Sequence, residues 1–384
     1  MKLGASSCDA FVAVAGTRPE ALKLAPVVLE LRRRGQPLML VATGQHRELL
    51  ADALGDFGLR ADVDLAIMRD GQSPADVVGA LIPALTRLFE AQQPAAVLVQ
   101  GDTASTLAAA QAAAYARRPL VHVEAGLRSG HAEPFPEEMH RRVIAQLADV
   151  HFAPTAGAAA ALQSEGIAPA AIHVTGNTGI DALQLMQARL RDDPRLAAAQ
   201  AARFAGIDEN RPWLLLTVHR RENHGSRLAA VLAAAAELAT DAEIIMPLHP
   251  SPAVRGPAEA TLGGRPGVHL LPPLDYPAFV WLMARATLAL TDSGGVQEEA
   301  PAFGLPLLVL RDVTERREGL ASGNARLVGT DTGAIVAVAR QLLFDAGALR
   351  QMSEVALPYG AGDASRRIAD VLAERFAPTL AAAE

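Results

Sequence analysis

Cysteine is nearly absent from this chain of 384 residues, in which Cys8 is the single example. One cysteine permits neither a disulfide within the chain nor a cysteine metal cluster, and this is typical of proteins in a reducing cytosol. Blocks of basic residues are absent as well, and the net charge is −7. We therefore expect a cytoplasmic protein without a nucleic-acid partner.

Long apolar runs and cofactor fingerprints are also missing. Asp9 interrupts the apolar stretch near the N-terminus before it reaches signal-peptide length, and Leu228–Ala239 is too short to span a bilayer. The segment after the first predicted strand is not GxGxxG, and neither HExxH nor a P-loop occurs. We expect no membrane partner, no metal and no cofactor.

Short apolar runs alternate with longer segments of helical spacing along the whole chain. Strands are predicted at Phe11–Ala15, Leu38–Thr43, Ala96–Gln100, Leu120–Glu124 and Val150–Ala153, and again at Trp213–Val218, Glu243–Pro247, His269–Leu271, Leu288–Thr291 and Leu307–Leu310. Such alternation is typical of parallel sheets with helices on both faces. The sequence therefore predicts an α/β fold with two Rossmann-like, doubly wound domains.

The joint between these domains is predicted at Val174–Ile180, which reads VTGNTGI and is rich in turn formers. The predicted domains cover residues 1–176 and 177–362. Ligands of such sheets bind at the carboxyl ends of the strands, so the active site is expected in the cleft between the domains.

The stretch that organises the second half is Leu288–Pro306, which reads LALTDSGGVQEEAPAFGLP. Gly294 and Gly295 would let the backbone approach a ligand, and a helix start offers free N–H groups and a partial positive charge. We interpret the stretch as a diphosphate cradle in which Glu298 or Glu299 accepts hydrogen bonds from ribose hydroxyls. An ordinary strand-turn-helix corner is the alternative for these glycines alone.

Cations and histidines follow several of the predicted strands. Arg18 and Lys23 lie at the start of the helix after the first strand. In the second half, His219 and Arg220 follow one strand and His249 follows the next. These groups could contact a phosphate or a sugar hydroxyl, whereas the alternatives are solvated surface charges and structural histidines.

Three carboxylates follow strands or begin helices in the first half. Asp102 and Glu124 stand at two successive strand ends, and Glu137 opens a helix on which Arg141 lies four residues later. Crowded carboxylates raise one another's proton affinities, as general acids and bases require, and Arg141 could hold one of them ionised. Each carboxylate alone would more often be a cap or a surface ion pair.

Eight motifs, in one order over nearly the whole chain, carry a family resemblance. They are GTRPEALKLAPV, QGDTAST, HVEAGLRSG, PFPEEMHRR, TGNTGIDAL, TVHRREN, LTDSGGVQEEAP and RDVTERREG. The chain resembles the non-hydrolysing UDP-N-acetylglucosamine 2-epimerases of bacteria. This resemblance implies two Rossmann-like domains in the arrangement of the B-type glycosyltransferases. It also implies that a C-terminal helix at about Asp363–Phe376 returns to the first domain, to which residues 363–384 are therefore assigned.

The resemblance further implies an isomerase that inverts C2 of UDP-GlcNAc to give UDP-ManNAc, for polysaccharide biosynthesis. UDP would be eliminated to leave a glycal intermediate and then added back. The positions that match the family's catalytic residues are Asp102, Glu124, Glu137, His219, Lys23 and Arg141. The positions that match its UDP-binding residues are Arg18, His249, Ser293, Gly294, Gly295, Glu299 and Arg316.

Members of the family bind a second UDP-GlcNAc as an activator beside the substrate. Gln45, His46 and Arg69 fall in the regions that the resemblance assigns to this allosteric site. A homodimer is also expected.

Three other activities share part of this pattern. A B-type glycosyltransferase would share the cradle but would not need three clustered carboxylates. A hydrolysing epimerase would release free ManNAc. A sugar-nucleotide sensor would keep the cradle without the acids, so the intact Asp102, Glu124 and Glu137 place it last.

Overall fold

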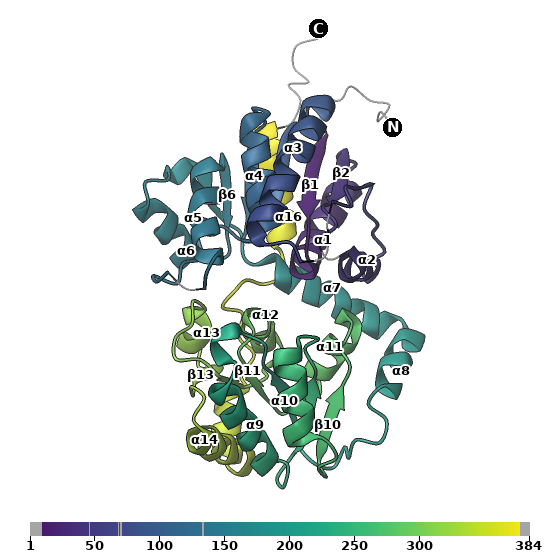
Figure 1. The fold of residues 1–384 in the computed structure, drawn as a ribbon, viewed down its shortest axis with the longest axis vertical. Coiled ribbons are helices and arrows are strands. Elements are labelled where there is room, and N and C mark those ends of the chain that lie inside the picture. Colours follow the sequence, from purple (N-terminus) through teal and green to yellow (C-terminus); the bar gives the residue numbers. More distant parts are fainter. Residues whose placement is uncertain (1–9, 46, 68, 70, 133, 377–384) are drawn as a thin grey trace. The chain divides into compact units, whose positions relative to one another are not determined.

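The computed structural model describes residues 10–45, 47–67, 69, 71–132 and 134–376. Within this part of the chain, the contacts form two compact units (Figure 1). The first unit holds the described residues up to Leu185 together with those from Tyr359 onward, and the second unit is Met186–Pro358.

The first unit is built on a seven-stranded parallel sheet with the order β3-β2-β1-β4-β5-β6-β7. Its strands are β1 (Phe11–Ala15), β2 (Leu38–Ala42), β3 (Val63–Asp64), β4 (Ala96–Gln100), β5 (Leu120–Val123), β6 (Val150–Ala153) and β7 (Ile172–Val174). Its helices are α1 (Arg18–Arg33), α2 (Arg47–Gly55), α3 (Pro74–Gln92), α4 (Ala104–Tyr115), α5 (Glu137–Leu147), α6 (Ala156–Ser164), η2 (Pro169–Ala171), the first part of α7 (Thr178–Asp192), and α16 (Ala364–Phe376).

Helices cover both faces of this sheet. Successive side chains of each strand point to opposite sides, so each strand contributes side chains to both faces. Phe11 and Ala13 of β1 pack with residues of α1, α2 and α16. Val12 and Val14 pack with residues of α3 and α4 on the other face. The apolar strands are therefore buried on both sides, as the alternating sequence pattern predicts.

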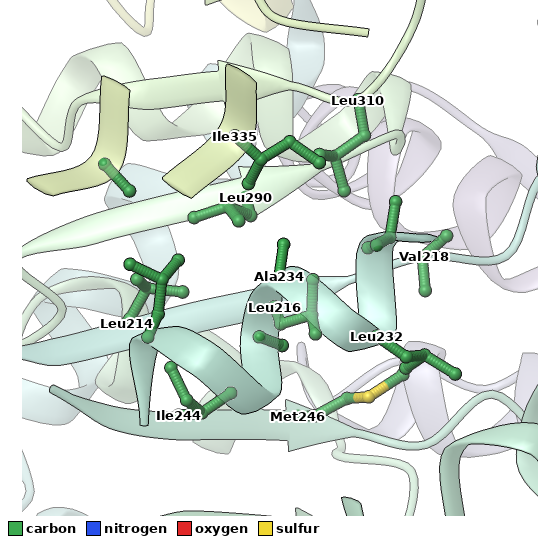
Figure 2. Close-up of a cluster of buried hydrophobic side chains, with 14 of the residues drawn as sticks. Leu214, Leu216, Val218, Leu232, Ala234, Ile244, Met246, Leu290, Leu310 and Ile335 are labelled. Carbon is green, nitrogen blue, oxygen red and sulfur yellow. The ribbon is translucent and has the colours of Figure 1, made fainter. Parts of the chain in front are cut away.

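The second unit contains a six-stranded parallel sheet with the order β10-β9-β8-β11-β12-β13. Its strands are β8 (Trp213–Thr217), β9 (Glu243–Pro247), β10 (Val268–Leu271), β11 (Leu288–Thr291), β12 (Leu307–Val309) and β13 (Ala325–Leu327). Its helices are α8 (Pro194–Ala202), η3 (Arg221–Asn223), α9 (Ser226–Leu238), α10 (Pro252–Leu262), α11 (Tyr276–Met283), α12 (Gly294–Glu299), η4 (Ala300–Phe303), α13 (Arg317–Ala321), α14 (Thr332–Phe344) and α15 (Ala346–Met352). Leu214, Leu290 and Ile335 lie in the core that β8, β11 and α14 share (Figure 2).

Every predicted strand is present, and the ends differ from the predicted ones by no more than one residue. The structure adds β3, β7 and β13, which the sequence analysis did not predict. These three edge strands contain only two or three residues each. Such short segments contain too little alternation to be distinguished from loops.

The C-terminal helix α16 packs on the first unit. Ile368 and Leu372 lie in the core beside α1, Phe376 meets Phe11 edge to face, and Arg34 binds Asp370 at 2.7 Å. Residues 377–384 of the predicted returning segment lie outside the described residues.

The VTGNTGI segment lies inside the first unit, and the division falls later, within α7 after Leu185. Its backbone is tied to the returning chain, because Asn177 N–H donates to the Tyr359 carbonyl at 2.7 Å. Asp181 of α7 accepts hydrogen bonds from the N–H groups of Ala364 and Ser365, at 3.2 and 2.7 Å, and so caps α16. These contacts hold residues 174–181 to the first unit, despite their turn-forming composition.

No single helix in the described part of the chain is long and apolar enough to cross a membrane. The pair α14 and α15 together reaches that length and composition, but the two helices are bent by 100° where they join.

Candidate active site

Glu124 follows β5 and adopts a left-handed backbone conformation, with φ of +66°. This backbone conformation is unfavourable for residues other than glycine, and such strain is concentrated at functional sites. The Lys23 ammonium and the Gln100 amide each donate to one oxygen of its carboxylate. Helix α1 and strand β4 therefore hold Glu124 at the carboxyl edge of the sheet.

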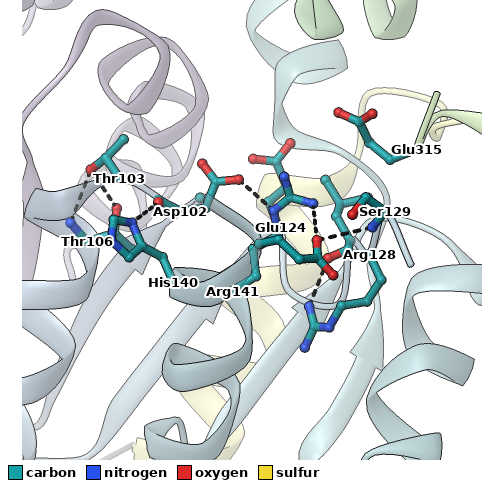
Figure 3. A network of polar contacts seen from close by, with 12 residues as sticks. Asp102, Thr103, Thr106, Glu124, Arg128, Ser129, His140, Arg141 and Glu315 are labelled. Atoms are coloured by element: carbon teal, nitrogen blue, oxygen red, sulfur yellow. Dashed lines mark hydrogen bonds and ion pairs between the residues drawn. The ribbon is translucent and has the colours of Figure 1, made fainter. Parts of the chain in front are cut away.

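Asp102 lies in the turn after β4, on the same edge (Figure 3). Its Oδ2 accepts a hydrogen bond from Arg141 Nε at 2.8 Å. A Cβ on the preceding Gly101 would lie 3.8 Å from Glu124 Oε2, so the turn passes close to the second carboxylate. The first unit thus brings together Asp102, Glu124, Lys23 and Arg141.

Glu137 is the first residue of α5 and is partly exposed. The structure gives it no side-chain hydrogen bond or ion pair with another described residue. Arg141 instead contacts the buried Glu138, whose Oε2 lies 3.0 Å from Arg141 Nη1. Glu138 was not among the predicted site residues, although the pair at i and i+3 could have indicated it.

Gln45 and Arg69 lie in the loops after β2 and β3. Ser105 Oγ donates to Gln45 Oε1 at 2.7 Å. A Cβ on Gly44 would lie 3.1 Å from the Ala66 Cα, so the backbones of the two loops are in contact. The Arg69 side chain is exposed, and His46 lies outside the described residues.

The predicted cradle in the second unit has the expected strand, turn and helix. Ser293 is the N-cap residue of α12, which begins at Gly294. Gly294 lies against Arg316, because a Cβ at that position would be 2.6 Å from the Arg316 Cζ. Arg316 Nε and Nη2 bind Glu298 Oε1 at 3.0 and 2.8 Å.

Glu299 is the more suitable of the two carboxylates predicted to face a ribose. Glu298 is buried and bound to Arg316. Glu299 accepts a hydrogen bond from the Tyr276 hydroxyl at 3.3 Å. Glu299 is partly exposed, so a ligand can reach it more readily than it can reach the buried Glu298.

His219 and His249 stack on each other in the loops after β8 and β9. Their ring centroids are 5.5 Å apart and the rings are inclined by 18°. Burial lowers the pKa of His219, against the nearby Asp292 carboxylate, which raises it. Burial also lowers the pKa of His249, so both rings favour the neutral imidazole, which can both donate and accept hydrogen bonds. Arg18, at the first position of α1, lies in the other unit.

The family model for UDP-N-acetylglucosamine 2-epimerase matches residues 29–373 of this chain. The chain belongs to this epimerase family.

Relatives and solved structures agree with the family match. The UDP-N-acetylglucosamine 2-epimerases of Escherichia coli K12 and Bacillus subtilis are each 42% identical, over 94% of this chain and 97% and 93% of their own. The Neisseria meningitidis UDP-GlcNAc 2-epimerase bound to UDP-GlcNAc superposes with a TM-score of 0.92 at 41% identity, covering 95% of this chain and all of that one. The predicted family, the epimerase class and the fold of two Rossmann-like domains are confirmed.

Besides Glu138, three further buried carboxylates of the epimerase were not among the predicted site residues. Glu20 accepts hydrogen bonds from the N–H groups of Gly16 and Thr17, at 2.6 and 2.7 Å, and from the hydroxyls of Thr103 and Thr106. Burial raises the pKa of Glu20 despite these donors. The spacing of Thr17 and Glu20, a capping box, could have indicated the residue.

Asp292 and Glu315 organise the second unit in the same way. Asp292 is fully buried and accepts hydrogen bonds from the N–H groups of His219 and Arg220, which fixes the loop after β8. Glu315 contacts the guanidinium groups of Arg220, Arg311 and Arg316. Burial alone would raise the pKa of Glu315, but these cations outweigh it and hold that pKa well below its usual range.

Proposed function

We propose that this epimerase interconverts UDP-GlcNAc and UDP-ManNAc by elimination of UDP and its re-addition to a glycal intermediate. The observation that carries this proposal is the Glu124 carboxylate beside the Asp102–Arg141 pair. Glu124 has a left-handed backbone, and its carboxylate accepts hydrogen bonds from Lys23 and Gln100. The Neisseria meningitidis relative was solved with UDP-GlcNAc, and the Methanocaldococcus jannaschii epimerase, 29% identical, was solved with UDP-GlcNAc and UDP.

The elimination breaks the C2–H bond and the C1–O bond to UDP, and it forms a C1–C2 double bond. UDP leaves with the electron pair of the broken C1–O bond, and a carboxylate accepts the C2 proton. Re-addition of UDP with protonation on the opposite face of C2 gives the other epimer. We assign these proton transfers to Asp102, Glu124 and Glu137 as a group, because general acids and bases must lie within reach of the proton.

Departure of UDP is assisted by groups that stabilise its developing negative charge. We assign this role in the second unit to Arg316, with Gly294 and Gly295 giving the diphosphate access to the backbone. Ser293 and Glu299 are assigned to the nucleotide, together with Arg18 and His249. His219, beside His249, and Lys23, beside Glu124, are assigned to the reacting sugar. Cytoplasmic location and a homodimer remain predictions.

Solvent deuterium is expected at C2 of both nucleotide sugars when the protein is incubated with UDP-GlcNAc in deuterated water without added metal or nicotinamide. Each passage through the glycal exchanges the C2 proton, so the C2 proton signal disappears while UDP-ManNAc accumulates. Proton NMR of the mixture measures both changes. Release of free ManNAc would support the hydrolysing alternative, and an absolute need for an acceptor sugar would support a glycosyltransferase.

The activator site is a second part of the proposal. Gln45 and Arg69 come from loops that contact each other through Gly44 and Ala66, and Arg69 is exposed. An exposed guanidinium is well suited to bind a phosphate. We propose that a second UDP-GlcNAc binds there.

Arg69→Ala is expected to weaken activation, so that the reverse reaction, begun from UDP-ManNAc alone, shows a longer lag and needs more added UDP-GlcNAc. A ligand can shift a conformational equilibrium only through its differential affinity for the two states, and the substitution removes part of that affinity. Progress curves at increasing UDP-GlcNAc measure the effect, with Arg87→Ala on α3 as a control. A wild-type reaction from pure UDP-ManNAc that shows no lag would remove the regulatory assignment.

A further inference from the structure

Two imidazole rings hold the backbone of the turn that carries Asp102. His140 Nδ1 lies 2.7 Å from the Asp102 carbonyl oxygen (Figure 3), and His122 Nε2 lies 2.8 Å from the Gly101 carbonyl oxygen. Both rings are buried, with exposed fractions of 3% and 1%. Their contacts are therefore fixed features of the first unit.

The chemistry of these contacts defines which nitrogen carries the proton. A carbonyl oxygen only accepts hydrogen bonds, so His140 donates from Nδ1 and His122 donates from Nε2. Burial lowers the pKa of His122 to about 4, so its ring is neutral near pH 7. Neither ring can exchange a proton with the carbonyl it contacts, and this points to a positional role.

His140 and Arg141 are consecutive residues of α5 that bind two different groups of one residue. His140 holds the Asp102 carbonyl, and Arg141 Nε holds the Asp102 carboxylate at 2.8 Å. The preceding Gly101 has φ of +76°, so the turn adopts a backbone conformation that is accessible chiefly to glycine. Two contacts, one to the main chain and one to the side chain of Asp102, therefore hold the carboxylate on this turn.

We propose that His140 is a positioning residue that sets the place of the Asp102 carboxylate through the backbone of its turn. This inference rests on the proposed epimerase function, in which Asp102 takes part in proton transfer. A misplacement of about 1 Å in a reacting group can cost on the order of 10²-fold in rate. Loss of one donor to a carbonyl, with Arg141 still in place, is expected to cost less.

The test compares variants of His140 that keep or remove the donor. In His140→Asn, the amide nitrogen occupies nearly the position of Nδ1, since both are bonded to the γ carbon. His140→Leu and His140→Ala lack any donor and differ from each other in volume. We expect the two donor-free variants to lower kcat roughly 10-fold or more, whereas His140→Asn stays within about threefold of wild type. KM for UDP-GlcNAc and the Kd for UDP should change by less than about threefold in all of them.

A double-mutant cycle with Asp102→Asn separates positioning from general structural support. If His140 acts through the Asp102 carboxylate, His140→Leu should cost little further activity once that carboxylate is gone, so the two effects are not additive. His269→Leu is the matched control, because His269 binds Glu243 at the amino end of the second unit's sheet and should leave kcat unchanged. Thermal unfolding of each variant shows which of them are folded.

Several outcomes would overturn the inference. Wild-type kcat in a folded donor-free variant would do so, as would equal losses in His140→Asn and His140→Leu, or additive effects in the cycle. If both donor-free variants misfold and His140→Asn is also inactive, the role of His140 is purely structural. Failure of the proposed function is a separate result, because wild-type protein would then give no deuterium at C2.

Discussion

Glu124→Gln is expected to lower kcat by on the order of 10²-fold or more, which is the usual effect of removing a general acid or base. The substitution conserves the shape of the side chain but removes its charge, so Lys23 loses the carboxylate that it contacts. UDP binding should remain within a few-fold of wild type, because the cradle lies in the other unit. Initial rates measured by NMR and UDP titration by calorimetry test the two parts separately.

Glu90→Gln, an exposed position on α3, is the matched control and should keep wild-type turnover. Asp102→Asn and Glu137→Gln are expected to lower kcat to a similar extent as Glu124→Gln. Near wild-type rates in all three carboxylate variants, combined with a collapse of UDP binding, would show that these residues bind the nucleotide and would refute the mechanism.

The strands could be predicted because they are buried on both faces. A parallel strand covered by helices must be apolar over its whole length, as Leu214–Leu216 and Val97–Val99 are, and this leaves a signal in the sequence alone. The boundary between the units carries no such signal. It depends on which helix the returning chain contacts, and the bonds of Asp181 to Ala364 and Ser365 join residues far apart in sequence.

The site residues also differ in how far they could be predicted, because some depend on local sequence and others on contacts between distant segments. The ends of parallel strands identify Asp102, Glu124 and His219, since the fold places strand ends on one edge of each sheet. The capping box of Thr17 and Glu20 marks only a helix start, and Glu315 has no local signal, because a carboxylate becomes a buried anchor only when donors from other elements surround it. Arg141 shows where local sequence is insufficient. Its helical spacing allowed an ion pair with Glu137 or with Glu138, and in the folded chain Arg141 pairs with Glu138.

Gly294→Ala is expected to weaken UDP binding roughly 10- to 100-fold and to lower the stability of the second unit. The added Cβ would lie 2.6 Å from the Arg316 Cζ, so the guanidinium has to move. The displaced guanidinium weakens its ion pairs with the buried Glu298 and Glu315, and its charge leaves the place where the diphosphate is proposed to bind. Loss of a charged hydrogen bond costs about 1.5–3 kcal/mol, which corresponds to this change in Kd.

Gly295→Ala is the matched control for this substitution. Outside the adjoining backbone, the nearest atom of the described residues to a Cβ at residue 295 would be Ser293 Oγ at 4.0 Å. The substitution should therefore leave the free protein unchanged, and any loss of affinity would report contact with UDP itself. Arg316→Ala should weaken UDP binding at least as much as Gly294→Ala, and the two substitutions together should cost no more than Arg316→Ala alone, because both act on one guanidinium. Calorimetric titration with UDP measures each Kd. Wild-type affinity in Gly294→Ala, or additive losses in the double variant, would contradict the assignment of Arg316 to the diphosphate.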